Sequence, residues 1–456
     1  MKTKILVLDI GKTNVKLCAL DTHGDVLEVV KKPNTPIQTG QFIHADVEGI
    51  WGWLCEGVQT LASHHHFEYF AITTHGATAV CLSQGELAFP VLDYEDSQYE
   101  AVSEAYDAVR PAFAESYSPK LKGGLNIGQQ LYWLEQNYPN EFAKVDTILM
   151  YPQYWAWRLC GVAASEVTSL GCHTDLWAPD KKQFSSMVET LGWLPRFPEV
   201  KPSGSILGRV KPELAKALGL PESCQVINDL HDSNASLVPY LKQADRLFTV
   251  ISTGTWTIMA NIGGDTSLLD EHKDMLANVN AYGSPVPCIR FMGGREWEVL
   301  RDAPDSSQSD LTSVLEKALY VLPSFADAGG PFQRFEGKIM GDMALLSATE
   351  KTALASLYCA LMTDYCLDAL ASHGDIFIEG SFTQNEVYQQ ALQLLRPNQR
   401  VRISDDSTGT LSGSVAIAQS LRSDITPHTH TLTPWFSLSN ALLQYKQNWR
   451  ALIPML

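Results

Sequence analysis

The sequence predicts an α/β protein made of two similar domains, and three observations lead to this expectation. At 456 residues the chain is longer than a single hydrophobic core normally supports. Strand-like and helix-like segments alternate along it, as they do in α/β folds. A strand, glycine turn and strand open the chain and return after its midpoint, which indicates a duplicated unit.

The first half is expected to open on a meander of three strands. Apolar segments at 4–9, 14–20 and 26–31 are separated by short connectors with hairpin-turn composition. A fourth strand is expected at 70–74, directly before His75 and Gly76. Helical periodicity then predicts helices over 126–136, 152–159 and 212–218.

The second half is expected to begin with a similar hairpin, whose strands cover 246–252 and 255–261. Its turn, Thr253-Gly254-Thr255, resembles the turn at Gly11 because a threonine follows the glycine within two residues in both. One glycine hairpin alone is a common structural feature, whereas two with matching polar neighbours favour a duplication. The boundary is expected near 241–245, giving domains 1–243 and 244–456. A helix over 347–373 and a strand at 375–379 follow.

Composition and charge narrow the class of protein. The formal net charge of −17 disfavours nucleic acid and anionic membranes as partners. Hydrophobic residues make up 45% of the chain, yet no stretch approaches 18 uninterrupted apolar residues. The nine cysteines are scattered, without a Cys-x-x-Cys pair. We expect a cytoplasmic protein that binds a small molecule. These features leave open whether it forms a homodimer.

The first turn has the residues that a phosphate-binding hairpin needs. Glycine lets the backbone amides approach an anion, and hydroxyl or cationic side chains complete the cradle. Gly11 is followed by Lys12, Thr13 and Asn14, with Lys16 on the next strand. Asp9 ends the first strand and is a candidate Mg²⁺ ligand, because Mg²⁺ favours one or two carboxylates plus substrate phosphates.

A candidate general base stands in the segment 226–235. A predicted strand leads to His231-Asp232, and a helix is expected to start with Ser233 as its cap. The helix N-terminus favours the ionised form of Asp232, which leaves this carboxylate able to accept a proton from a hydroxyl. Two alternatives remain open: Asp232 is only a capping residue, or Asp229 is the base.

The order of these motifs resembles the FGGY carbohydrate kinases, with the rhamnulokinase and fuculokinase branch nearest. The resemblance runs from about residue 4 to 420 and covers Asp-x-Gly-x-Thr-x-x-Lys, His-Asp before a helix, and Ser-x-Gly-Thr-Trp. Further matching stretches lie at 151–161, 165–168, 201–205, 380–385 and 410–413. The resemblance implies two actin-like (ribonuclease-H-like) domains with a central cleft, the first binding sugar and the second nucleotide.

The resemblance also implies roles for individual residues. Asp232 matches the catalytic base of the family. The positions implied for ATP are Gly11, Lys12, Thr13, Asn14, Lys16, Thr253, Gly254, Thr255, Gly380, Ser381 and Asn385. The positions expected to face the sugar are His75, Gly76, Asp96, Gln153, Tyr154 and His231. With Mg²⁺ near Asp9, the expected function is ATP-dependent phosphorylation of a small ketose of the rhamnulose, fuculose, ribulose or xylulose type.

Three departures from the family pattern bear on specificity. Lys12 stands where a threonine or serine is common, and Ser381 and Phe382 replace glycines of the adenosine turn. The arginine that often follows the sugar-binding aspartate is missing after Asp96, which puts the identity of the sugar in doubt. Two other functions of the same fold are alternatives, an ATPase that serves as a chaperone or reactivating factor and a non-catalytic sugar-binding regulator.

Overall fold

A computed structural model describes residues 4–241, 247–326, 329–405, 409–419 and 425–453. The chain divides into two compact units. Unit 1 comprises residues 1–242, 277–285 and 408–426, and unit 2 comprises residues 243–276, 286–407 and 427–456. The domain boundary expected near 241–245 lies outside the described residues, apart from Leu241.

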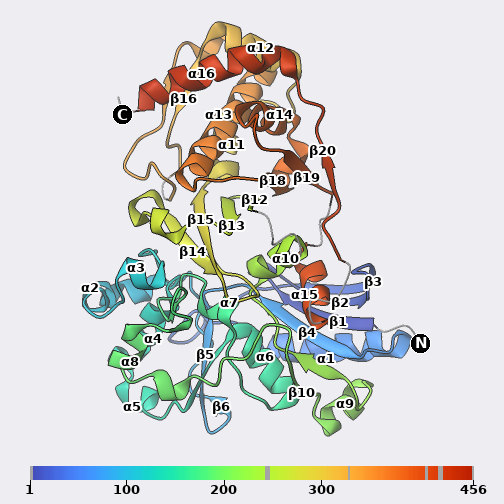
Figure 1. Ribbon diagram of the computed structural model, residues 1–456. Helices are drawn as coiled ribbons and strands as arrows, with labels where there is room; N and C mark the ends of the chain where they lie inside the picture. The colour runs from blue at the N-terminus through green and yellow to red at the C-terminus, as the bar shows by residue number, and fades with distance from the viewer. Residues whose placement is uncertain (1–3, 242–246, 327–328, 406–408, 420–424, 454–456) are drawn as a thin grey trace. The chain divides into compact units, whose positions relative to one another are not determined.

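Unit 1 is built on a six-stranded mixed sheet (Figure 1). Its strands lie in the order β10 (Ile206–Arg209), β11 (Gln225–Ile227), β4 (Tyr69–Thr74), β1 (Lys4–Ile10), β2 (Asn14–Asp21) and β3 (Val26–Pro33). The first three strands form the predicted antiparallel meander, and β4 and β11 add in parallel beside β1. Two smaller sheets are also present. One combines β5 (Ala79–Ser83), β6 (Glu86–Leu87) and β7 (Thr147–Met150), and the other pairs β8 (Trp177–Ala178) with β9 (Gln183–Phe184).

Unit 2 holds most of a seven-stranded sheet with a closely similar plan. The order is β14 (Met275–Val279), β15 (Pro285–Phe291), β13 (Thr257–Ile262), β12 (Phe248–Thr253), β18 (Asp375–Gly380), β19 (Val401–Ser404) and β20 (Thr429–Thr431). A short ribbon pairs β16 (Tyr320–Leu322) with β17 (Lys338–Met340). In both main sheets a hairpin is followed by two parallel strands and a final antiparallel one.

This shared topology confirms the duplication that the glycine hairpins predicted. Ile10 pairs with Thr74 at the end of β1 and β4, and Thr253 pairs with Gly380 at the end of β12 and β18. The turn after Ile10 and the turn after Thr253 therefore occupy equivalent places, at the carboxyl ends of parallel strands. Ligands of such sheets characteristically bind at these ends.

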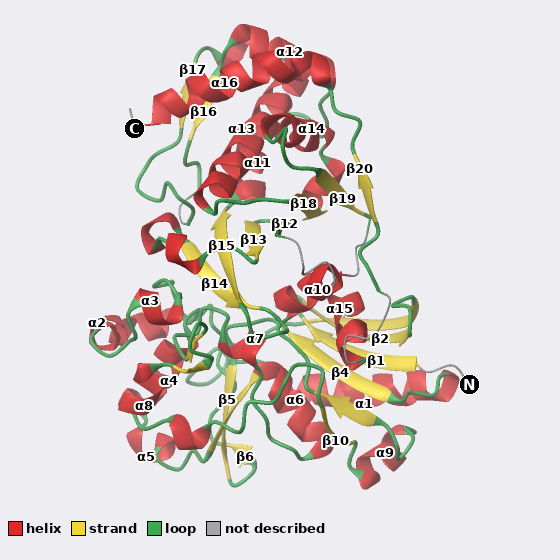
Figure 2. Ribbon diagram, in the orientation of Figure 1, coloured by secondary structure: helices red, strands yellow, loops and turns green. Residues whose placement is uncertain are grey.

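Helices cover both faces of the first sheet (Figure 2). One face carries α1 (Val47–His64), α6 (Tyr151–Cys160) and α9 (Pro212–Leu218), and the other carries α10 (Asp232–Leu241) and α15 (Gly409–Ala418). The rest of unit 1 contains α2 (Ser103–Asp107), α3 (Phe113–Ser116), α4 (Ile127–Asn137), α5 (Pro139–Phe142), α7 (Val167–Leu170) and α8 (Ser186–Thr190). The three helices predicted in this half are found as α4, α6 and α9.

Helix α15 lies beside α10 although more than 160 positions separate them in sequence, as the red and green helices of Figure 1 show. A Cβ on Gly413 would lie 1.9 Å from the Ala235 carbonyl oxygen, so only glycine allows this close crossing. The Gln419 side chain also donates to the Thr22 carbonyl at 2.8 Å. A late segment of the chain thus supports the helix that begins at Asp232.

The helices of unit 2 are α11 (Gly293–Leu300), α12 (Gln308–Lys317), α13 (Ala348–Ala369), α14 (Glu386–Leu395) and α16 (Ser439–Leu452). Helix α13 is the long predicted helix, and it begins with a capping box between Ser347 and Glu350. It is buried over most of its length in the core of unit 2. Among the described residues, no helix combines the length and the apolar character that crossing a membrane requires.

Candidate active site

The first hairpin turn presents exposed polar groups on a backbone that is held in place. The Gly11 amide donates to the Asn14 carbonyl at 2.9 Å, and the Asn34 side chain donates to the Gly11 carbonyl at 2.8 Å. Thr13, Asn14 and Lys16 are exposed. A Cβ on Gly11 would make a tight contact of 3.2 Å with the Asn14 carbonyl oxygen, short of a severe clash. The turn therefore keeps the open backbone expected of a phosphate cradle.

Lys12 turns toward another part of unit 1. Its Nζ lies 2.6 Å from both carboxylate oxygens of Asp93 and 3.3 Å from Glu95 Oε2. The ammonium group also stands 4.5 Å from the centroid of the Tyr94 ring. Lys12 was expected in the phosphate cradle, whereas Asp93 was not among the expected site residues, since its only signal was its position in an acidic segment.

Asp96 is occupied by its own turn. Its carboxylate accepts hydrogen bonds from the Gln98 amide at 3.1 Å, the Gln98 side chain at 2.9 Å and the Ile43 amide at 3.3 Å. Asp93, by contrast, lines a small cavity of about 20 Å³ together with Lys12, Asn34, Pro36, Ala45, His75, Thr78, Leu92 and Tyr94. In this structure Asp96 therefore shapes the loop, while Asp93 stands beside His75.

The end of β4 brings His75 and Gly76 next to His231. Thr74 and His231 form a parallel bridge, and the Thr73 hydroxyl donates to the Leu230 carbonyl at 2.9 Å. A Cβ on Gly76 would lie 2.8 Å from His231 Nε2, so the absent side chain makes room for this ring. Burial lowers the pKa of His75, and a nearby Asp232 charge opposes that shift. His75, Gly76, His231 and Asp232 thus form one cluster.

Asp232 is the first residue of α10, one position earlier than the expected start at Ser233. Its Oδ1 accepts from the Ser233 amide at 2.5 Å and the Ser233 hydroxyl at 3.1 Å. The side chain is 27% exposed, so it can reach a ligand. Burial raises the pKa of Asp232, while His75 and the Ser233 hydrogen bonds lower it. These features suit a general base.

His231 acts on Asp232 as a neutral ring. Burial lowers the pKa of His231 to about 4, so the imidazole is uncharged near neutral pH. The Asn234 side chain, as its amide is oriented, donates to Nδ1 at 3.0 Å, which places the ring proton on Nε2. Nε2 lies 3.2 Å from Asp232 Oδ1 and donates to it. The contact is a hydrogen bond between a neutral donor and a carboxylate.

Asp229, the alternative base, is less accessible. It is only 1% exposed, and burial raises its pKa to about 7. A group shielded in this way cannot reach a substrate hydroxyl without rearrangement of the core. The geometry therefore favours Asp232 over Asp229.

Asp9 meets the requirements of a metal ligand in part. It is 8% exposed, and Lys16 Nζ lies 3.5 Å from its Oδ2. Burial raises the pKa of Asp9 to about 6, and the Asp232 carboxylate adds to this shift. A cation placed near both carboxylates would relieve their repulsion, which fits a Mg²⁺ ion completed by phosphate oxygens.

Gln153 and Tyr154 lie in the interior. Gln153 is 1% exposed and donates to Asn228 Oδ1 at 3.2 Å and to the Asp229 carbonyl at 2.9 Å. Tyr154 is 2% exposed, and its hydroxyl accepts from Arg158 at 3.3 Å. Here Gln153 holds the segment that leads to His231, and neither side chain is open to a ligand.

Unit 2 contains a cavity of about 660 Å³, a size suited to a nucleotide. Its lining comprises Gly254, Thr255, Gly294, Arg295, Trp297, Glu298, Pro304, Asp305, Ser306, Thr352, Ser381, Phe382, Gln384, Asn385 and Glu386. Four residues predicted to bind ATP are among them: Gly254, Thr255, Ser381 and Asn385. The structure brings these residues together across more than 120 positions of sequence.

The other two predicted residues of this cavity form its frame. Gly380 has φ +84°, and a Cβ there would lie 1.9 Å from the Thr253 carbonyl oxygen. Thr253 Oγ1 donates to the Glu379 carbonyl at 2.5 Å and accepts from the Phe382 amide at 2.9 Å. These contacts fasten the hairpin turn to the end of β18. Only glycine fits at position 380.

The start of α11 also lies at this cavity, and it was not among the expected site residues. A Cβ on Gly294 would lie 2.1 Å from the Gly254 carbonyl oxygen, so the first turn of this helix packs directly on the hairpin turn. The N-terminus of a helix carries partial positive charge and free amides, which favour phosphate. Two consecutive glycines, Gly293 and Gly294, are typical of a loop, so the sequence did not indicate that a helix begins there. Trp297 on α11 adds an aromatic wall beside Phe382, at a ring distance of 6.0 Å.

Comparison with known proteins agrees with these features. Residues 4–239 match the N-terminal domain of the FGGY family of carbohydrate kinases, and residues 245–427 match the C-terminal domain of carbohydrate kinase FGGY. L-fuculokinase of Escherichia coli K12 is 23% identical over 332 residues, 70% of each chain. Rhamnulokinase of Halalkalibacterium halodurans is 31% identical over 135 residues, 29% of this chain and 28% of that one.

Solved structures extend the likeness to the whole chain. A carbohydrate kinase from Novosphingobium aromaticivorans superposes with a TM-score of 0.91 at 36% identity, covering 98% of this chain and 100% of the other. A xylulose kinase from Lactobacillus acidophilus shares the fold, with a TM-score of 0.79 at 15% identity, over 99% and 97% of the two chains. The expected two-domain actin-like fold is confirmed. The chain belongs to the FGGY family of carbohydrate kinases, and it is a phosphotransferase.

Proposed function

We propose that this kinase transfers the γ-phosphate of ATP to a hydroxyl group of a small neutral ketose. The observation that carries the proposal is Asp232, a partly exposed carboxylate with a raised pKa at the start of α10. Neutral His231 donates to its Oδ1 and orients it. Asp232 accepts the proton of the attacking hydroxyl, and the sugar lies against His75 and Gly76.

ATP is proposed to bind in the unit 2 cavity. The adenosine part lies between Trp297 and the segment 381–385, and the Gly254 turn, which lines the same cavity, holds phosphate. The Gly11 turn of unit 1 is proposed as a second phosphate-binding turn. Mg²⁺ is proposed at Asp9, where it would neutralise phosphate charge. Positioning and charge neutralisation are the main demands of phosphoryl transfer, so no covalent intermediate is required.

The two other functions of the fold receive less support. An ATPase that acts as a chaperone needs no base directed at an alcohol, and a sugar-binding regulator needs no nucleotide cavity. The Asp232 cluster and the unit 2 cavity together favour a kinase.

A substrate panel tests the proposal. We expect ADP release with at least one of L-rhamnulose, L-fuculose, D- and L-ribulose, and D- and L-xylulose, with gluconate turned over far more slowly. The physical reason is that the described sugar-side cluster offers no unpaired cation for a carboxylate, because Lys12 is paired with Asp93. The measurement is kcat/KM for each sugar at saturating MgATP. Gluconate exceeding every ketose by more than tenfold would contradict the proposal.

The glycine turns give a second test. Gly254→Val and Gly11→Val should each raise the KM for ATP by about tenfold or more, because a β-branched side chain blocks the approach of phosphate to the backbone. A Cβ on Gly254 meets nothing closer than 3.9 Å, so this variant should fold. Gly52→Val, at an exposed position of α1 where a Cβ also meets nothing within 4 Å, is a control for general effects of valine. Normal ATP affinity in a folded Gly254→Val protein would make that hairpin purely structural.

A further inference from the structure

The ion pair of Lys12 with Asp93 is built into the sugar side of unit 1. Lys12 extends from the first hairpin turn, and Asp93 comes from the segment after Leu92, 81 positions later. The Asp93 amide donates to the Ile43 carbonyl at 2.9 Å, and the Tyr99 hydroxyl donates to the Asp93 carbonyl at 2.9 Å. The Asp93 side chain is only 8% exposed. This carboxylate is held rigidly where Lys12 meets it.

Aromatic rings lie beside the pair and beside His75. The Tyr94 ring lies 4.5 Å from Lys12 Nζ and 5.7 Å from the ring of His75, and the Tyr151 ring lies 5.4 Å from that of His75. The His75 Nδ1 contacts the Gly76 carbonyl at 2.9 Å and donates to it, which leaves Nε2 as an acceptor. Charged polar groups beside aromatic rings are the surroundings in which proteins bind sugars.

The charges at this place exclude an anionic ligand. Lys12 supplies one positive charge, whereas Asp93 and Glu95 together supply two negative charges within 3.3 Å of it. Both Asp93 and Asp232 act electrostatically on His75, so a further carboxylate is near. The ligand group that enters here must therefore carry no negative charge, which a hydroxyl group satisfies.

The size of the cavity limits what can enter. Its volume of about 20 Å³ holds roughly one water molecule, or one hydroxyl group in its place. A hydroxyl group is both donor and acceptor, so it can donate to Asp93 while it accepts from Lys12. A methyl group can do neither, and a carboxylate cannot donate and is repelled.

We propose that Lys12 and Asp93 together bind one hydroxyl group of the sugar and thereby select a neutral polyhydroxy substrate over a sugar acid. The inference rests on the proposed function, which it makes more specific. It assigns Lys12 to the sugar and leaves the phosphates to the backbone of the turn, to Thr13 and to Lys16.

Kinetics of Lys12 variants separate the two roles. Lys12→Met should raise the KM for L-fuculose, or for whichever panel ketose the wild-type protein prefers, by about tenfold or more. The KM for MgATP should change less than twofold, and Lys12→Arg should recover part of the sugar affinity. Lys120→Met is a matched control, because Lys120 pairs with Asp107 on the surface of the same unit. A rise in the KM for MgATP alone would overturn the inference and return Lys12 to the phosphates.

A charge variant tests selectivity. In the double variant Asp93→Asn with Glu95→Gln, Lys12 loses both partners and becomes a free cation. The ratio of kcat/KM for gluconate to that for the ketose should then rise by about tenfold or more. An unchanged ratio in a folded protein would overturn the inference. If the wild-type protein turns over no panel ketose at all, the proposed function itself fails, which is a different outcome from these.

Discussion

Asp232→Asn is expected to lower kcat by about 10²–10⁴-fold, because an amide cannot accept the proton of the sugar hydroxyl. The substitution keeps the shape of the side chain, and its oxygen can still accept from Ser233 and His231. ATP affinity should therefore stay nearly unchanged. The measurements are steady-state kinetics with the preferred ketose and equilibrium binding of ATP.

The control for this prediction is Asp229→Asn, an equally small change at the buried alternative. It should leave kcat within about tenfold of the wild-type value, because Asp229 is shielded from substrate. Near-wild-type turnover by Asp232→Asn would assign the general base to another residue.

The pH dependence of kcat gives a further check. Burial raises the pKa of Asp232, so wild-type kcat should fall with decreasing pH, and this acidic limb of the profile should lie above the ordinary aspartate range. Residual turnover in Asp232→Asn should lack that limb.

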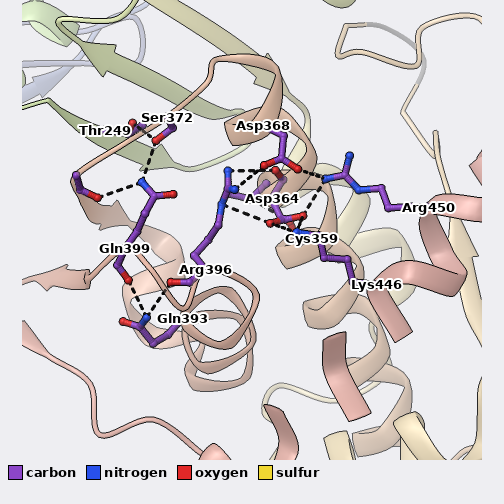
Figure 3. A network of polar contacts seen from close by, with 12 residues as sticks. Thr249, Cys359, Asp364, Asp368, Ser372, Gln393, Arg396, Gln399, Lys446 and Arg450 are labelled. Atoms are coloured by element: carbon purple, nitrogen blue, oxygen red, sulfur yellow. Dashed lines mark hydrogen bonds and ion pairs between the residues drawn. The ribbon is translucent and has the colours of Figure 1, made fainter. Parts of the chain in front are cut away.

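Asp364→Asn is expected to destabilise unit 2 by about 3 kcal/mol, because it removes a fully buried negative charge from three partly buried cations. Asp364 on α13 is fully buried, and three cations surround its carboxylate (Figure 3). Lys446 and Arg450 approach to 2.8 Å, and Arg396 to 3.4 Å. Urea unfolding, followed through the transition of unit 2, measures the effect.

The same contacts explain the size of the expected decrease in the free energy of unfolding of unit 2. Arg396 follows α14 and Lys446 and Arg450 belong to α16, so one carboxylate links three helices. Asp368, one turn further along α13, also contacts Arg396 at 2.5 Å and Arg450 at 3.0 Å (Figure 3). It is 45% exposed and cannot replace the buried charge.

A matched control uses an exposed ion pair on the same helix. Lys351 contacts Asp302 at 2.8 Å, and the Asp302 side chain is 52% exposed. Asp302→Asn should cost less than about 1 kcal/mol, since solvent screens such pairs. Equal effects of Asp302→Asn and Asp364→Asn would mean that the buried network does not hold the three helices together.

Much of the fold could be predicted because its signals are local. Glycine turns between apolar strands, as at Gly11 and Gly254, specify hairpins within a few residues. Ser347 and Glu350 mark the start of α13 in the same way. The candidate general base could also be recognised from the sequence, since Asp232 stands between a predicted strand and a predicted helix. The order of such signals also resembled a family to which the chain proved to belong.

The sequence by itself thus determined the α/β class, the duplicated hairpins, the family and the candidate base. Only the tertiary structure decided that Lys12 meets Asp93 across 81 positions, that Asp96 binds its own loop, and that Gln153 is buried. It also placed residues 408–426 in unit 1. The physical reason is the sequence separation between interacting residues. Turns and caps depend on neighbours in sequence. The partner of a charged side chain depends instead on which distant segments the packed core brings together.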